Sequence, residues 1–169
     1  MTNPTDLKFM RRALELAREA GTRTGTSPIG AVLVLDGEII GEGFNQVGHD
    51  HDPTAHAEIV TLRRAGQHMR TSRFAGATLY STLQPCGMCT MASIWAGVKT
   101  IVYGAERGQV HEMYFEDRHF DIMDYLDDAY RDDMRISGGI LAEDCAALCY
   151  KPDDHPPRDA MANLPPKPE

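Results

Sequence analysis

Residues 83–89 read LQPCGMC, which places Cys86 and Cys89 three positions apart directly after a proline. Proline is favoured at the first position of a helix, so this pattern predicts a helix whose opening turn carries both thiols. A helix N-terminus carries roughly half a positive charge and unpaired backbone N–H groups, which lower the pKa of a thiol and favour metal-binding thiolates. The stretch therefore predicts part of a site for a soft cation.

A second helix start is predicted at residues 52–60, DPTAHAEIV, whose first residue, an aspartate, can cap the helix. His56 lies near this start, and one imidazole with two thiolates makes three protein ligands. Zinc with three protein ligands keeps its fourth position for water or substrate, which is typical of catalytic sites. We therefore expect His56, Cys86 and Cys89 to bind one Zn2+ per subunit. Glu58 is not needed as a ligand and is the predicted catalytic acid and base.

Other interpretations of a C-x-x-C pair are a thioredoxin-type redox pair and half of a structural zinc ribbon. A ribbon needs a second close cysteine pair, and Cys145 and Cys149 are four positions apart in an apolar run, where free cysteines pack as small hydrophobic residues. The redox interpretation leaves His56 and Glu58 unexplained, whereas H-x-E followed by P-C-x-x-C is the signature of zinc deaminases. A zinc-stabilised binding module without activity is disfavoured, because it would need neither Glu58 nor a site with only three ligands.

With both halves of the signature present, the chain resembles the cytidine-deaminase-like superfamily, in particular the branch of guanine deaminases, fungal-type cytosine deaminases and bacterial tRNA adenosine deaminases. The resemblance runs from about residue 7 to residue 150. It implies an α/β fold, a three-layer α/β/α sandwich with a central mixed five-stranded sheet. The stretches that carry it are residues 27–34, 43–45, 52–59, 78–83 and 85–89.

The resemblance also implies which residues contact the substrate. In similar deaminases the asparagine that matches Asn45 hydrogen-bonds the base or the sugar, although Asn45 could be only a turn residue. Backbone groups near Ala57 and Cys86 would hold the base. Gln84 stands where relatives often have glutamate or serine, and Pro85 follows it. The expected substrate-binding set is Asn45, Ala57, Gln84 and Pro85.

Turn signals and apolar runs predict the remaining elements. Asp36-Gly37 separates two such runs, residues 29–35 and 38–44, and predicts a hairpin whose first strand is buried on both faces. The strand–helix–strand pattern over residues 77–103 predicts two parallel strands, and both ligand-bearing helix starts should lie at the carboxyl ends of strands, where open α/β sheets bind ligands. Further helices are expected over 7–21, 53–66 and 141–150, and a short strand over 136–140.

The length of 169 residues predicts one domain: a zinc-dependent deaminase domain at 1–150, followed by a proline-rich, disordered tail at 151–169. No apolar run approaches the roughly eighteen residues of a membrane span, and the first residues lack the profile of a secretory signal. Four cysteines fit a reducing compartment better than a disulfide framework. We therefore expect a cytoplasmic protein without membrane contact.

The net charge of −8 argues against a surface built mainly to bind nucleic-acid phosphates. Residues 105–135 hold ten acidic residues and four arginines. This charge favours a free base or nucleoside of the guanine or cytosine type as the substrate, deaminated hydrolytically with release of ammonia. The alternative is a tRNA adenosine deaminase that converts the wobble adenosine to inosine, because the resemblance along residues 48–59 and 138–148 is greatest with that group.

Several residues outside the motif carry further expectations. Since relatives are usually dimers, the resemblance implies a homodimer, and Trp95 should lie in the core or in a subunit contact. A tryptophan also occupies the matching place in guanine-deaminase-like sequences. The arginines of the first helix should form a solvated face, and His111 is expected at the surface. Residues 114–117, YFED, resemble the aromatic and acidic lid of fungal cytosine deaminase, and a helix with an acidic outer face is expected in the second half of 105–135.

Overall fold

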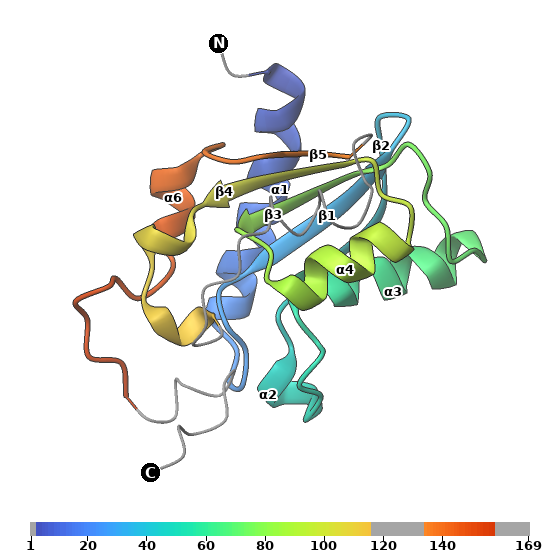
Figure 1. Cartoon of the computed structure of the whole chain (residues 1–169). Coiled ribbons are helices and arrows are strands. Elements are labelled where there is room, and N and C mark those ends of the chain that lie inside the picture. Colours follow the sequence, from blue (N-terminus) through green and yellow to red (C-terminus); the bar gives the residue numbers. More distant parts are fainter. Residues whose placement is uncertain (1–2, 116–133, 158–169) are drawn as a thin grey trace.

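The computed structural model describes residues 3–115 and 134–157 (Figure 1). Its sheet is built from five strands, and helices lie on both of its sides. The α-helices are α1 (Pro4–Gly21), α2 (Val47–Asp50), α3 (Ala57–Met69), α4 (Gly87–Trp95) and α6 (Ala142–Ala146); the strands are β1 (Gly30–Leu35), β2 (Glu38–Phe44), β3 (Thr78–Leu83), β4 (Thr100–Ala105) and β5 (Arg135–Ser137); and two short 3-10 helices are η1 (Arg107–Gln109) and η2 (Glu112–Tyr114).

The strands lie in the order β2-β1-β3-β4-β5. β1 pairs antiparallel with β2 and with β3, whereas β3 pairs parallel with β4 and β4 with β5. The buried pattern of β1 agrees with its central place in the sheet. The predicted mixed five-stranded sheet and its parallel strand–helix–strand unit are therefore confirmed.

The helices form two layers, one on each face of the sheet. On one face α1 packs against β1 and β3, and the Tyr80 hydroxyl of β3 donates a hydrogen bond to Asp6 of α1 at 2.8 Å. α6 lies on the same face against β4, where Gly104 leaves room for the Cys145 side chain. On the other face α3 packs against β2 and β1 and contacts α4 (Figure 1). This arrangement is the predicted three-layer sandwich.

Glycines allow the layers to approach closely. A Cβ at Gly30 of β1 would lie 2.2 Å from the carbonyl oxygen of Ala13 and 2.7 Å from the backbone nitrogen of Ala17, both in α1. A Cβ at Gly41 of β2 would lie 2.6 Å from the carbonyl oxygen of Thr61 in α3. Backbone therefore lies almost directly on backbone at both points, which only glycine permits.

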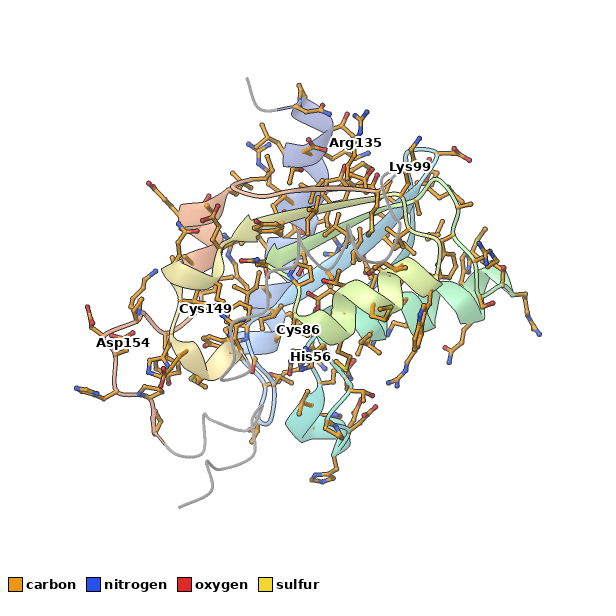
Figure 2. The ribbon with its side chains drawn as sticks, in the orientation of Figure 1. His56, Cys86, Lys99, Arg135, Cys149 and Asp154 are labelled. Atoms are coloured by element: carbon orange, nitrogen blue, oxygen red, sulfur yellow. The ribbon has the colours of Figure 1, made fainter. Side chains whose placement is uncertain are left out.

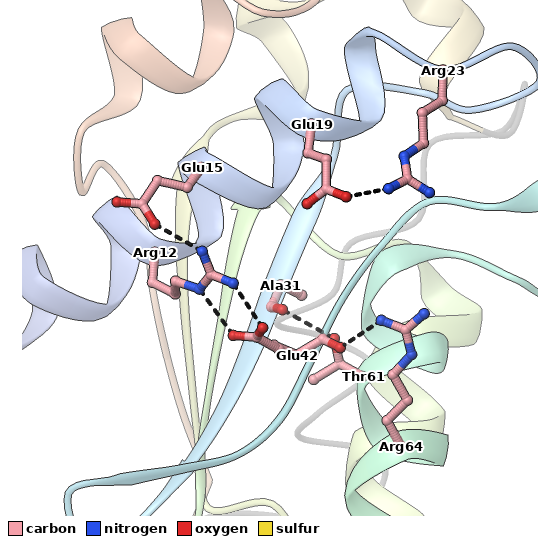
Figure 3. A network of polar contacts seen from close by, with 8 residues as sticks. All are labelled: Arg12, Glu15, Glu19, Arg23, Ala31, Glu42, Thr61 and Arg64. Atoms are coloured by element: carbon pink, nitrogen blue, oxygen red, sulfur yellow. Dashed lines mark hydrogen bonds and ion pairs between the residues drawn. The ribbon is translucent and has the colours of Figure 1, made fainter.

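Arg12 of α1 is paired with Glu42 of the edge strand β2 (Figure 3). The guanidinium donates two hydrogen bonds to the carboxylate, at 2.9 and 2.7 Å, and this contact lowers the pKa of Glu42. Arg64 of α3 donates to the carbonyl oxygen of Glu42 at 3.0 Å. Arg23, which follows α1, also forms an ion pair with Glu19. Two of the arginines in this region therefore form ion pairs at the surface instead of contacting solvent alone.

Two helices begin later than their prolines predict. α3 begins at Ala57 rather than near residue 53, because the Asp52 carboxylate accepts hydrogen bonds from the backbone N–H and hydroxyl of Thr54 in a separate turn. α4 begins at Gly87, so Pro85 precedes the capping residue instead of starting the helix.

The ends of the elements also differ from prediction. α3 continues to Met69 and stops where Arg70 adopts a left-handed conformation. The final helix covers only Ala142–Ala146, after a left-handed Leu141, and so ends earlier than expected. The final strand covers residues 135–137 rather than 136–140.

Trp95 at the end of α4 is 75% exposed, so its predicted place in the core is wrong, and a subunit contact stays a prediction. The expected acidic helix falls on residues 116–133, and most of the expected tail on 158–169, both outside the described residues. The domain boundary after residue 150 also stays a prediction. Across residues 3–115 and 134–157, the structure contains no helix with the length and apolarity required to traverse a bilayer.

Candidate zinc centre and active site

Two helix starts meet at the carboxyl end of β3. His56 is the N-cap residue of α3 and Cys86 that of α4, while Cys89 lies in the first turn of α4. Neither His56 nor Cys86 caps its own helix through its side chain. Figure 2 labels His56 and Cys86 close together beside the start of α4, far from Lys99 and Arg135, which precede or begin parallel strands at the other end of the sheet. The site therefore has the predicted position.

The three side chains present a compact set of ligand atoms. The Nδ1 atom of His56 lies 3.6 Å from the sulfur of Cys86 and 3.7 Å from that of Cys89. Ordinary zinc–nitrogen and zinc–sulfur bonds at a tetrahedral angle separate the two ligand atoms by about 3.6 Å. One imidazole and two thiols are also a ligand set that zinc prefers. His56, Cys86 and Cys89 thus form a possible zinc site, and their spacing fits the ion.

The two thiols differ in acidity. A hydrogen bond with Cys89 lowers the pKa of Cys86 to about 4, with further help from His56, despite partial burial. The same hydrogen bond raises the pKa of the buried Cys89 thiol well above its ordinary value. Cys86 is therefore ready to bind a cation as a thiolate, whereas Cys89 must release a proton when it becomes a ligand.

Glu58 is the second residue of α3, two positions after His56, and is only 4% exposed. One carboxylate oxygen accepts a hydrogen bond from the Ser81 hydroxyl of β3 at 2.9 Å, and the other accepts one from the Cys89 thiol at 3.5 Å. Burial, followed by the negative charge of Cys86, raises the pKa of Glu58. A carboxyl group with a raised pKa beside a metal site is suited to accept and return a proton.

A small pocket, partly open to solvent, reaches this centre. The predicted residues Asn45, Ala57 and Gln84 line it together with His56, Glu58 and Cys86, and the rest of its lining consists of Ile29, Leu83, Tyr114 and Phe115. Pro85 is fully buried and is not among the lining residues. Its contact with substrate stays a prediction.

Asn45 and Gln84 are held in place by the backbone. The side-chain oxygen of Asn45, a buried residue, accepts from the backbone N–H of Val47 at 3.3 Å, so Asn45 stabilises a turn as well as lining the pocket. The side-chain oxygen of Gln84 accepts from the backbone N–H of Arg107 at 3.1 Å. In both residues the side-chain amide nitrogen supplies donors that a base could use.

Two residues in and around the site are not as the sequence predicts. His111 is buried rather than at the surface, because its Nδ1 accepts from the backbone N–H of Met113 and caps η2. Ser81, the partner of Glu58, was not predicted, because nothing in the sequence separates its hydroxyl from those of Thr78, Tyr80 and Thr82 in the same strand. Tyr114 and Phe115 line the pocket, whereas residues 116 and 117 lie outside the described residues, so the role of this segment as a lid stays a prediction.

The family described as the cytidine and deoxycytidylate deaminase zinc-binding region matches residues 3–105. The chain belongs to this family. The matched region contains the three possible zinc ligands and Glu58, and the predicted family and zinc cofactor are confirmed. This chain is therefore a deaminase of the zinc-dependent hydrolytic type.

Two relatives differ in substrate. The tRNA-specific adenosine deaminase of Haemophilus influenzae is 41% identical to this deaminase over 142 residues, which cover 83% of this chain and 79% of the relative. The guanine deaminase of Bacillus subtilis is 40% identical over 109 residues, which cover 64% of this chain and 70% of the relative. A solved structure from a study of A-to-I editing by tRNA:A34 deaminases at the wobble position has a TM-score of 0.71 and 34% identity, covering 83% of this chain and 98% of that chain.

Proposed function

We propose that this deaminase converts the wobble adenosine of tRNA to inosine and releases ammonia. The observation that carries the proposal is the similarity to a tRNA-specific adenosine deaminase along 83% of this chain, at 41% identity. The structure from the study of tRNA:A34 deaminases supports it, since 98% of that chain is covered. The net charge of −8 favoured a small substrate, but total charge does not decide whether a local surface binds RNA.

His56, Cys86 and Cys89 would hold Zn2+. The ion would act as a Lewis acid, which lowers the pKa of a water molecule to about 7. Glu58 would take one proton from this water and pass it to the ring nitrogen; it would then take the second proton, from the hydroxyl that the water leaves on the ring carbon, and pass it to the amine, which departs as ammonia when the carbon–nitrogen bond breaks. The Ser81 hydroxyl holds one oxygen of Glu58, so the carboxylate has a defined orientation toward the ligand sulfurs.

The rest of the pocket would position the base. Asn45 and Gln84 offer amide donors to polar atoms of the ring, and the backbone near Ala57 borders the same space. Apolar walls from Ile29 and Leu83 limit the access of water to the reacting atoms. A base within an RNA would have to leave its stack to reach these groups.

A second candidate substrate is free guanine. It is favoured by the 40% identity to the guanine deaminase of Bacillus subtilis, although that match covers 64% of this chain. The same centre would suit both substrates, because each is a purine whose ring carbon carries an amino group. The two candidates differ in whether RNA around the base contributes to binding.

The test is ammonia release by zinc-loaded protein from a tRNA anticodon stem-loop with a wobble adenosine, from free adenosine, and from guanine and cytosine. Glu58→Ala serves as the blank. We expect turnover of the stem-loop, with inosine at the wobble position confirmed by mass spectrometry. Turnover of guanine or cytosine with none of the stem-loop would contradict the proposal and support a small-molecule deaminase.

We also propose a homodimer. Met88 and Trp95 lie seven positions apart on α4, so they project from the same side of the helix, and they are 37% and 75% exposed. No residue of α4 carries a charge. A second copy of the chain would cover these side chains, since a surface of this kind is typical of protein interfaces.

A further inference from the structure

Glu58 is held by a hydroxyl from outside the zinc-binding motif. The Ser81 side chain of β3 donates a hydrogen bond to Oε1 of Glu58 at 2.9 Å, across 23 positions of the sequence. Ser81 is 0% exposed and Glu58 is 4% exposed. Burial of a hydroxyl or a carboxyl group is unfavourable unless the group is hydrogen-bonded. Each of these two side chains therefore supplies a partner that the other needs in the core.

The alternation of side chains along β3 directs Ser81 toward α3. Tyr80 donates to Asp6 of α1, so the Tyr80 side chain points to the face of the sheet that α1 covers. Successive side chains of a strand point to opposite faces, so Ser81 points to the face that α3 covers. Leu79 and Leu83, its neighbours on that face, are buried and apolar. Ser81 is thus the single polar side chain that β3 presents to α3.

Other contacts fix the position of α3 on the sheet. The Thr61 hydroxyl, three positions after Glu58, donates to the carbonyl oxygen of Ala31 in β1 at 3.1 Å, and Thr61 is fully buried. The backbone of β2 at Gly41 also lies directly against the carbonyl oxygen of Thr61. Loss of the Ser81 hydroxyl should therefore free the Glu58 side chain to change its rotamer and leave the helix in place.

The second oxygen of Glu58 faces the zinc ligands. Oε2 accepts from the Cys89 thiol at 3.5 Å, a longer contact than the one with Ser81. A thiol loses its proton when it becomes a metal ligand, so Cys89 would no longer donate to Glu58 in the zinc-loaded protein. Within residues 3–115 and 134–157, Ser81 is then the remaining side chain that donates a hydrogen bond to Glu58.

We infer that Ser81 is a positioning residue: it anchors Oε1 of Glu58 to the sheet, so that Oε2 faces the zinc ligands and is the oxygen that carries protons from water to substrate. The inference rests on the proposed function for the acid–base role of Glu58. Ser81 is not among the residues that line the pocket, so it acts through Glu58. A catalytic group that is already held in its reactive orientation does not have to reorient during the reaction.

The test compares the two buried hydroxyls that join α3 to the sheet. Ser81→Ala removes the one that holds Glu58, and Thr61→Val removes the other and keeps the shape of the side chain. Both are assayed with the substrate that the wild type deaminates. Ser81→Ala should lower kcat by about tenfold or more, the change expected for loss of a hydrogen bond to a charged group, with KM within about twofold. Thr61→Val should lower the urea midpoint but keep kcat within about twofold.

Three further measurements separate positioning from a general structural effect. Ser81→Thr restores a hydroxyl and should restore kcat. In protein that already carries Glu58→Ala, Ser81→Ala should change the residual turnover by less than about twofold, because the side chain that Ser81 positions is gone. Crystal structures of the zinc-loaded proteins need no turnover: the Glu58 carboxylate should have one conformation in the wild type and a different one, or several, in Ser81→Ala. Zinc content verifies that each variant is loaded.

An unchanged kcat in Ser81→Ala would overturn the inference, and so would an equal loss of kcat in Thr61→Val, a folded Ser81→Thr without recovery, or a further loss in the Glu58→Ala background. If Ser81→Ala does not fold, Ser81→Cys, which has a similar shape and a weaker donor, takes its place with the same expected loss. Absence of ammonia release from every substrate by the wild type would instead overturn the proposed function. The conformation of Glu58 in the two crystal structures would then decide the inference.

Discussion

Glu58 is a carboxyl group that the fold removes from water, and its surroundings favour the protonated form. Burial raises its pKa, so its contribution to stability is fully present below the ordinary value of 4.5 and is lost as the pH rises through the raised value. Glu58→Gln keeps the shape but cannot ionise. We expect it to bind zinc, to resist urea at pH 8 at least as well as the wild type in the metal-free form, and to lose about 100-fold or more of kcat. Metal analysis, urea unfolding and ammonia release measure these three effects, and near-normal turnover would contradict the proposed role.

The four cysteines should differ in reactivity toward iodoacetamide. Cys86 is partly exposed and has a pKa lowered to about 4, so it should react first in metal-free protein at pH 7 and be protected by zinc. Burial raises the pKa of Cys145 to about 12 and that of Cys149 to about 11. These two thiols therefore stay protonated at pH 8 and should react only after unfolding. Peptide mass spectrometry identifies the labelled sites, and equal labelling of Cys86 with and without zinc would contradict its role as a ligand.

The residues of the zinc centre could be predicted from the sequence, but the residues that surround and support them could not. His56, Cys86 and Cys89 could be found because residue type and spacing are demanded by the metal. Ser81 could not, because its role depends on the pairing of β3 with β1 and on the contact that brings α3 onto the sheet. The position of Tyr114 also depends on a contact between distant parts of the chain, because its hydroxyl accepts a hydrogen bond from the backbone N–H of Tyr150.

Among the elements, the contact of α1 with β1 leaves the least space. Gly30→Ala would place a methyl group 2.2 Å from the Ala13 carbonyl oxygen, so the helix would have to move away from the sheet. We expect a loss of about 1–3 kcal/mol in the free energy of unfolding, the usual cost of overpacking. Gly21→Ala is the matched control, because its Cβ would meet only Pro28 at an ordinary 3.6 Å. Urea unfolding measures both variants, and equal stability of the two would show that α1 adapts without cost.

The order and type of these elements could be predicted because apolar runs, glycines and prolines mark them in the sequence. Their boundaries could not, since competing local hydrogen bonds decide them. Asp52 was expected to cap a helix but serves a turn with Thr54, and the helix start moves to Ala57. The residue at which a helix begins depends on the position and direction of the chain as it leaves the preceding strand. A local sequence pattern does not contain this information.

For the whole molecule, the expected assembly is a homodimer through the outer side of α4. Trp95→Lys would place a charge in the middle of this surface, so we expect the protein to become a monomer while it keeps its zinc. Multi-angle light scattering measures the mass, and Lys99→Glu, an exposed change at the other end of the sheet, is the control. A wild-type monomer, or a Trp95→Lys variant with unchanged mass, would contradict the proposed dimer.

The strand order has a consequence for aggregation. β2 and β5 are the two edges of the sheet, and the edge of a sheet is a template for the addition of a strand from another chain. β5 has only three residues and begins with Arg135, while β2 carries Glu38 and Glu42 and pairs with β1 through a register shift. Short, charged or irregular edges are poor templates. The two sheet edges are therefore poor sites for the addition of strands from other copies of the chain. Copies of this chain should associate through side-chain contacts instead.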